Sequence, residues 1–390
     1  MIAATVVALA LGVLALQWNG RGQAPRGTSS SIRTTSTAKR LDRSVAQPNT
    51  KTPGDAELPT RGAAVTLATA VEPTGSTTVK DMVLSADDGW HVNSLALNAG
   101  QRVRGPAGTR PRVSVPPGGL VVGCDDVSFE NIDFVCEARD AGHSTEHTAM
   151  IVIAGQSVEL RGCSMAGSGD AEPSAIRWNG SADRQLGPGG ELTLRDCVVS
   201  GLAAVFDCPG TANLSVRLSN TLCVAAGPIV RLRGRTSGDE RLAMSLEHVT
   251  TRGDCTVLEF HYGKLDKSFG PIEISISVTA SALDTNPGGG LLVFAGGQRP
   301  DPLLRAITWS GDGSLVTPHA AMAVWHGPGD KRHVLPEDAL EIAGLVRSRV
   351  EFAGSAEGPP SASRVIQWQA PLRSPEAPGI DSNSLYLPKN

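Results

Sequence analysis

Short runs of alternating apolar and polar residues dominate the chain from about Leu95 onward, and each run ends at glycine or at a small polar corner. Alternation with a period of two predicts β-strands that bury one face and expose the other. Six runs share an apolar-x-apolar core, then two polar or small residues, then a compact residue; they are VSFENIDF, VELRGCSM, LTLRDCVV, VRLSNTLC, MSLEHVTT and ISVTASAL. The pattern predicts an all-β, internally repetitive protein.

The spacing of these runs indicates how the repeats assemble. Alignment on Phe129, Leu160, Leu194, Leu218, Leu246 and Val278 gives intervals of 31, 34, 24, 28 and 32 residues. A second series recurs with them: AMIVIAG, AIRWNG, AVFDCPG, IVRLRG, VLEFHYG and LLVFAGG. Two or three short strands per repeat of this length predict a right-handed parallel β-helix, in which stacking supplies the core that no repeat buries alone.

Stacking in a β-helix also predicts columns of equivalent residues. One such column consists of Ile132, Cys163, Cys197, Thr221, Val249 and Ser281. The alternative fold is an antiparallel β-sandwich, which also has many short strands. Tight hairpin dipeptides are scarce between the runs and the same residue classes recur in register, so we favour the β-helix.

The two ends of the chain differ from the repeats. Residues 1–18 form an apolar segment that predicts a transmembrane helix or signal anchor, and residues 19–62 are rich in Ser, Thr, Pro, Gly and Arg, as in a disordered linker. The apolar segment lacks a basic stretch before it, which leaves its orientation open; a chain start placed inside a longer membrane protein would explain this. The β-helix domain is assigned to residues 63–353 and a C-terminal tail to residues 354–390.

Caps are expected at both ends of the β-helix, because an open solenoid exposes unpaired strand edges. The N-terminal cap is assigned to residues 63–90. At the other end, the run PEDALEIAGLVRSRVEF begins with proline and has a helical apolar period from Ala339 to Val346, which predicts a short capping helix.

The run LALNAGQRVRGPAGTRPRVSVPPGGLVVGCDDVSFENIDFV, the repeats after it and ITWSGDGSLV together resemble one bacterial family. These are the pectin-lyase-like right-handed β-helix domains of planctomycete-type bacteria, and the resemblance covers roughly residues 63–353. It implies an exported, membrane-tethered domain, in some members fused behind a membrane span to a serine/threonine kinase. Most members carry no assigned reaction, so the resemblance implies the fold more strongly than an activity.

The stretch GHSTEHTAMIVIAG contains His143, Glu146 and His147 in the order of the inverted zinc-protease motif. That motif requires an α-helix, because only there do residues four apart project toward one metal ion. Gly142 precedes it and a predicted strand begins two residues after His147, so we interpret the stretch as a polar loop. The sequence predicts no metal site and no cofactor.

Polysaccharide cleavage is the enzymatic alternative, because the fold hosts lyases and hydrolases. Asp125 and Asp126 are acidic neighbours, but they are also what a turn between strands contains. The lyase pattern R-x-P-x-x-R is absent, since Arg299, Pro302 and Arg305 have the wrong spacing, and the G-H-G and R-I-K motifs of hydrolases are absent too. No catalytic residue is assigned.

The second series of runs predicts one polar patch. Because Ile176, Val230 and Leu258 should point inward, their neighbours should form two outward columns, which are Arg177, Arg231 and Glu259, and then Asn179, Arg233 and His261. Such a patch could bind an anionic sugar or a carboxylate-bearing partner through bidentate contacts. The alternative is a solvated face with ion pairs across the strands.

Composition limits the partners. The net charge is −4 and no basic run is interleaved with aromatics, which argues against nucleic acid, and the aromatic content of 4% argues against a deep saccharide groove. The seven cysteines lack zinc-site spacing; Cys163 and Cys197 are the best-placed pair for a disulfide, and buried free thiols are the alternative. We expect a membrane-anchored, extracytoplasmic module that binds or scaffolds, at a cell-surface polysaccharide or a partner protein.

Overall fold

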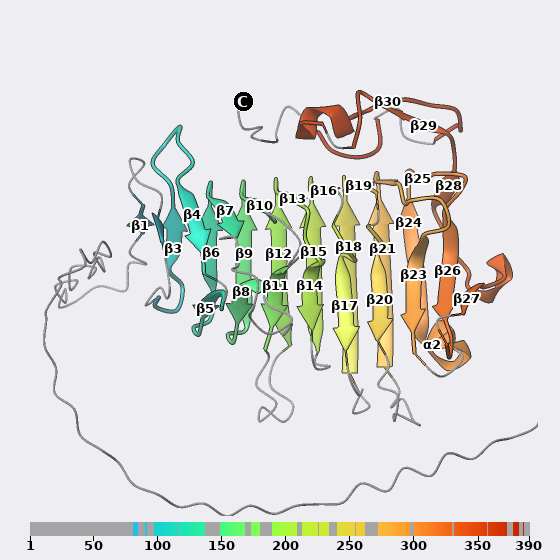
Figure 1. Cartoon of the computed structure of the whole chain (residues 1–390), viewed down its shortest axis with the longest axis horizontal. Coiled ribbons are helices and arrows are strands. Elements are labelled where there is room, and N and C mark those ends of the chain that lie inside the picture. The colour runs from blue at the N-terminus through green and yellow to red at the C-terminus, as the bar shows by residue number, and fades with distance from the viewer. Residues whose placement is uncertain are drawn as a thin grey trace, which may run out of the picture. The chain divides into compact units, whose positions relative to one another are not determined.

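Parallel strands stack side by side along the long axis of the computed structural model (Figure 1). The structure describes residues 81–84, 90–91, 97–116, 118–136, 149–167, 173–179, 189–208, 213–224, 226–233, 240–253, 255–261, 272–296, 300–329, 331–356, 358–372, 377–381 and 385. Within these residues the strands form three long sheets, called A, B and C here. The predicted transmembrane segment, the linker and nearly all of the N-terminal cap lie outside the described residues.

From Arg102 to His326, each repeat contributes one strand to each sheet, in the order A, B, C. Sheet A contains β1 (Met82–Val83), β3 (Arg102–Arg104), β6 (Val127–Glu130), β9 (Ser157–Arg161), β12 (Gly190–Arg195), β15 (Leu214–Ser219), β18 (Glu240–Glu247), β21 (Ile272–Thr279) and β24 (Ile307–Asp312). Sheet B contains β2 (Trp90–His91), β4 (Arg112–Val115), β7 (Asp133–Cys136), β10 (Ser164–Ala166), β13 (Val198–Ser200), β16 (Leu222–Val224), β19 (Thr250–Arg252), β22 (Ala282–Leu283), β25 (Ser314–Val316) and β28 (Leu345–Arg347). Sheet C contains β5 (Leu120–Val122), β8 (Ala149–Ile153), β11 (Ser174–Trp178), β14 (Ala204–Cys208), β17 (Val230–Arg233), β20 (Leu258–His261), β23 (Gly290–Ala295), β26 (Ala321–His326) and β27 (Arg332–Val334).

The strand register confirms the predicted repeat. The six residues used to align the first series are direct partners along sheet A: Phe129, Leu160, Leu194, Leu218, Leu246 and Val278. The second series aligns in the same way along sheet C, where Ile151, Ile176, Phe206, Val230 and Leu258 are successive partners. The pairing is parallel throughout these strands, so the chain is a parallel β-helix and the β-sandwich alternative is wrong.

Sheets A and B meet at a tight corner that recurs in successive repeats. One residue there has a left-handed backbone, with φ of 55° at Asn131, 53° at Asp196 and 45° at Asn220. Asparagine and aspartate tolerate this conformation better than most residues, and two other repeats place glycine there. In each of these repeats, the residue that follows the corner is a member of the predicted column of stacked residues. All six members of this column are buried. The column is therefore confirmed.

The compact residues of this column also satisfy buried backbone groups. The thiols of Cys163 and Cys197 donate to the carbonyls of Phe129 and Leu160, at 3.4 Å each, and the Thr221 hydroxyl donates to Leu194 at 3.4 Å. Each acceptor belongs to the preceding repeat, so these contacts bond neighbouring turns at the corner. A buried carbonyl without a partner would be costly, which explains small donor side chains at these positions.

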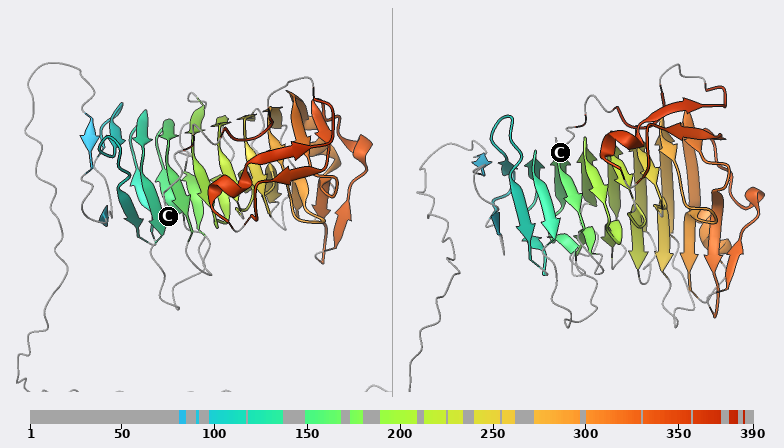
Figure 2. Two further views of the ribbon diagram at one scale, coloured as in Figure 1. Left: turned by 90° about the horizontal axis from the view of Figure 1, so that it is seen from above. Right: turned by 45° about the horizontal axis from the view of Figure 1, so that its top comes forward.

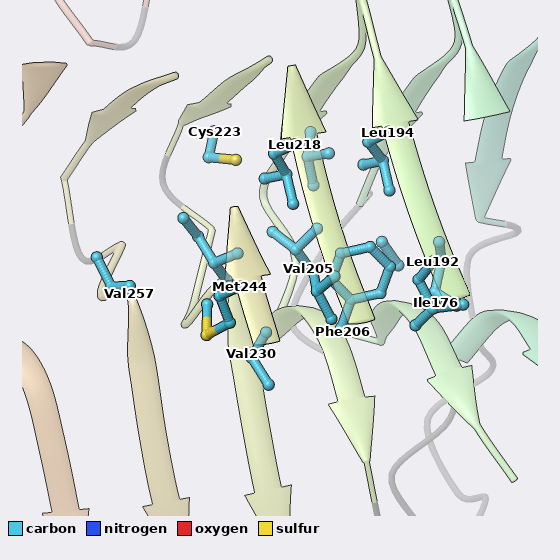
Figure 3. Packing of buried hydrophobic residues seen from close by; sticks show 14 of the residues in the cluster. Ile176, Leu192, Leu194, Val205, Phe206, Leu218, Cys223, Val230, Met244 and Val257 are labelled. Atoms are coloured by element: carbon cyan, nitrogen blue, oxygen red, sulfur yellow. The ribbon is translucent and has the colours of Figure 1, made fainter. Parts of the chain in front are cut away.

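Inward-facing side chains from all three sheets form one continuous core. Figure 3 shows part of it, where Leu194 and Leu218 of sheet A lie near Val205 and Phe206 of sheet C. The strands explain this directly, since β15 and β17 alternate buried apolar and outward polar residues. Trp178 is also buried, as its inward position in the second series predicts.

The predicted C-terminal capping helix is wrong. The segment contains only the 3-10 helix η1 (Glu337–Ala339), and the residues after it form strand β28, paired with β25 in sheet B. The backbone is already extended at Leu340, with φ of −143° and ψ of 127°, so the 3-10 helix ends there, before Gly344 adopts a left-handed φ of 75°. Pairing with the last turn of the β-helix thus outweighs the local helical pattern. The helix α2 (Asp301–Ala306) was not predicted.

The C-terminal segment, separated as a tail in the sequence, folds back along the outside of the β-helix. It contains β29 (Val350–Phe352), η2 (Pro360–Ser363) and β30 (Val365–Trp368), and β29 pairs with β30 in an antiparallel ladder (Figure 2). Arg252 of sheet B holds the segment, because its guanidinium lies 4.0 Å from the Phe352 ring centroid and donates to the Gly354 carbonyl at 2.9 Å.

Residues further along this segment cover the outer face of sheet B. The Ile380 amide donates to the Thr250 hydroxyl at 3.0 Å, and Ile380 and Leu385 pack against Val198 and Leu222. Sheet B thus has an apolar side chain on both faces at these strands. A β-helix domain that stops at residue 353 would leave this surface uncovered. No helix among the described residues is long and apolar enough to cross a membrane.

Candidate functional site

The predicted binding residues all lie on the outer face of sheet C. Arg177 belongs to β11 and Asn179 follows it, while Arg231 and Arg233 belong to β17 and Glu259 and His261 to β20. In each strand the residues between them are buried, so alternation turns these side chains outward. Arg231 is the direct partner of Glu259, and Arg233 is the direct partner of His261.

One acidic residue between these columns was missed in the sequence. Asp207 of β14 is the direct partner of Arg177 on one side and of Arg231 on the other. The first predicted column is therefore Arg177, Asp207, Arg231 and Glu259, with alternating charge, and the interpretation as an arginine-rich patch needs correction. The run AVFDCPG, aligned with IVRLRG, places Asp207 opposite Arg231, so the signal was present.

Two ion pairs cross the strands at this site. Nε of Arg231 lies 3.0 Å from Oε2 of Glu259, and Nε of Arg233 lies 2.8 Å from Oδ1 of Asp207. The side chain of Asp207 is only 1% exposed, while those of Arg231 and Glu259 are 14% and 15% exposed. Charges this deeply buried need partners, and the register supplies them from the neighbouring repeat. The ion pairs across the strands, given in the sequence analysis as the alternative, are therefore present on this face.

Glu259 has a second partner in His261. An ionised carboxylate only accepts hydrogen bonds, so Nε2 of His261 donates to Oε1 of Glu259. Burial acts to raise the pKa of Glu259, but the hydrogen bond from His261 and the charge of Arg231 outweigh it and hold this pKa below its ordinary value. Glu259 is consequently an anion at neutral pH. His261 is more exposed than the ion-paired residues beside it, with 41% of its side chain exposed.

The remaining candidates from the sequence have simpler outcomes. His143, Glu146 and His147 lie outside the described residues. Asp126 has a left-handed backbone, with φ of 57°, and Asp125 accepts a hydrogen bond from the Gln156 amide at 2.6 Å. The two aspartates therefore form the turn between β5 and β6. No group of three or more metal-ligating side chains occurs among the described residues.

Cys163 and Cys197 occupy adjacent turns, as predicted, but all seven cysteines are free thiols in the structure. Burial raises the pKa of Cys163 to about 12, so its thiol stays protonated and donates to the backbone. Burial also raises the pKa of Cys197. Such thiols behave as small apolar residues rather than as nucleophiles.

Comparison of this chain with protein-family models, with curated proteins and with solved structures finds no match.

Proposed function

We propose that this chain is a non-catalytic binding module whose ligand is an acidic polysaccharide, recognised by the guanidinium groups of Arg231 and Arg233 on sheet C. Each guanidinium is held through Nε by an acidic residue of a neighbouring repeat. Within the described chain, no hydrogen bond engages the terminal nitrogens of either group. The proposal rests on these two guanidinium groups, which are held in a fixed orientation and still have N–H groups that can donate to a ligand.

The chemistry of this face favours charge over ring stacking. Aromatic residues are 4% of the chain, so recognition of sugar rings by exposed Trp or Tyr is not its main means of binding. A planar guanidinium matches a uronate carboxylate in a bidentate arrangement, and the exposed edge of His261 adds a polar contact beside it. A polymer that runs along the solenoid would pass successive turns spaced about 4.8 Å apart.

Catalysis is the alternative, and one observation favours it. Asp207 and Glu259 lie two strands apart in one column, a separation of about 10 Å by strand spacing, which is near the range for a pair of glycosidase carboxylates. Each is nevertheless bound by an arginine, Asp207 is buried, and the low pKa of Glu259 opposes proton donation. A glycosidase acid needs a raised pKa, so binding fits this site better.

The cellular setting proposed for this module is the outer side of a membrane. The apolar residues 1–18 would anchor it, and residues 19–62 would act as a tether. This arrangement agrees with the resemblance to pectin-lyase-like domains, which also allows a serine/threonine kinase on the other side of the membrane. The polysaccharide ligand would then be part of a cell surface.

The test is a binding screen of the full-length chain on an array of neutral and acidic glycans, followed by calorimetry with the oligosaccharide that binds. Arg231→Lys and Arg233→Lys keep the charge but remove the planar fork, so each should weaken binding by about tenfold. Arg241→Lys is the matched control, because Arg241 is exposed on sheet A and pairs with Glu273 at 3.0 Å. Its affinity should equal that of the wild-type chain.

Two results would overturn parts of the proposal. Failure to bind any acidic glycan removes the polysaccharide ligand. Release of an unsaturated sugar or a new reducing end from a bound oligosaccharide shows catalysis, and Glu259→Gln then tests whether the carboxylate takes part.

A further inference from the structure

A pair of arginines on sheet A departs from the charge pairing seen on sheet C. Arg161 ends β9 and Arg195 ends β12, in the matching sequences ELRGC and TLRDC of successive repeats. The two residues are direct partners across the strands and both are exposed. Their Cα atoms are thus one strand spacing apart, about 4.8 Å.

Two neighbouring acidic residues bind other groups, and Glu159, on the same face two residues before Arg161, forms no ion pair with either arginine in the described structure. Glu130 is the strand partner of Arg161, but its carboxylate contacts Nε of Arg102 at 3.5 Å. Asp196, which follows Arg195 at the corner, accepts a hydrogen bond from Asn220 at 2.8 Å. On the other side of Arg195 the strand partner is the neutral Ser219.

Within the described chain, no ion pair joins Arg161 or Arg195 to a carboxylate. Arginines elsewhere on sheet A have such partners, for example Arg217 with Glu191 at 3.3 Å and Arg241 with Glu273 at 3.0 Å. Like charges directly opposite each other on a sheet repel, so this pair costs stability in the absence of an anion.

We infer that Arg161 and Arg195 form a binding site for a tetrahedral oxyanion, the sulfate or phosphate group of a free ion or of an ester on a polymer. A carboxylate has two oxygens in one plane and pairs with one guanidinium fork. A sulfate or phosphate presents oxygens in several directions and can accept from two guanidiniums on adjacent strands at once. An anion there would also replace the repulsion of the pair by attraction. The inference does not depend on the proposed function, because the two sites lie on different sheets.

The test measures thermal unfolding of the full-length chain in sodium sulfate and in sodium chloride at equal ionic strength. Wild-type protein should gain about 2 °C more in about 50 mM sulfate than in chloride, as expected for a weak ligand that binds only the folded state. Arg161→Glu and Arg195→Glu should remove this difference. Each variant should also unfold at a higher temperature than wild type in chloride, because it converts a like-charge pair into an ion pair. A substitution that disrupts the fold would instead lower the unfolding temperature in chloride.

Arg305→Glu is the matched control, since Arg305 is an exposed arginine of α2. It should keep the sulfate response of the wild type. Equal responses of the wild-type chain to sulfate and chloride, or a sulfate response retained in Arg195→Glu, would overturn the inference. Affinities for free sulfate, a sulfated oligosaccharide and an unsulfated one of equal length distinguish the two sources of the anion. If the sulfated oligosaccharide binds more tightly than free sulfate, the ligand is an ester on a polymer. If the sulfated oligosaccharide and free sulfate bind equally, the ligand is the free ion.

Discussion

The outer faces of sheets A and C show two ways in which a β-helix arranges charge. On sheet C, half-buried arginines alternate with acidic residues, and each ion pair crosses from one repeat to the next. On sheet A, two exposed arginines lie directly opposite each other. Burial therefore determines how strictly charges must be matched. A buried guanidinium needs an acidic neighbour, whereas an exposed one is solvated and can remain available to a ligand.

The largest effect should follow from removing the most buried charge. Asp207→Asn leaves Arg233 without its acidic partner, and should lower the free energy of unfolding by about 3 kcal/mol, as for other buried ion pairs that lose one member. Urea denaturation of the full-length chain measures this loss.

The matched substitution on sheet A is Glu191→Gln. The pair of Glu191 with Arg217 is 44% and 61% exposed, so its loss should cost less than about 1 kcal/mol. If Asp207→Asn and Glu191→Gln lower the free energy of unfolding by similar amounts, the expected difference between buried and exposed ion pairs is wrong.

A smaller effect should appear in the pH dependence of stability. The folded-state pKa of Glu259 is below its ordinary value, so the unfolded chain binds its proton more readily than the folded chain does. Glu259 therefore stabilises the fold above its unfolded-state pKa of about 4.3, and this contribution is lost as the pH falls through the folded-state pKa. Urea denaturation of the wild type and of Glu259→Gln should show an advantage for the wild type at pH 7 that shrinks toward pH 3. An advantage that is constant with pH would contradict the assignment.

The smallest effect concerns the like-charge pair on sheet A. Arg195→Glu should raise the free energy of unfolding by about 0.5 kcal/mol at low ionic strength, because it places opposite charges on adjacent strands. The gain should disappear in about 0.5 M sodium chloride, since exposed charges are screened there. If the gain persists at high salt, packing and not charge causes the difference in stability between Arg195→Glu and the wild type.

The sequence predicted the fold and the direction of the site residues because both depend on local periodicity. Alternation determines which side chains enter the core, and equal patterns in successive repeats determine the register, so Phe129 and Leu160 could be paired from their letters alone. The same alignment placed Arg231 beside Glu259. It also contained Asp207, whose role depends on the order of charges within one column.

Contacts between distant parts of the chain were decided only by the tertiary structure. Residues 339–346 have a helical pattern, but strand pairing with the last turn of the β-helix is worth more than local propensity. The C-terminal segment has the composition of a tail, yet the Asp381 amide bonds to Asn220, which is 161 residues earlier in the chain. Such contacts leave no periodic signal, because a segment that packs once against a surface repeats nothing. Local pattern therefore determined the solenoid, and long-range packing determined which of its faces remain open.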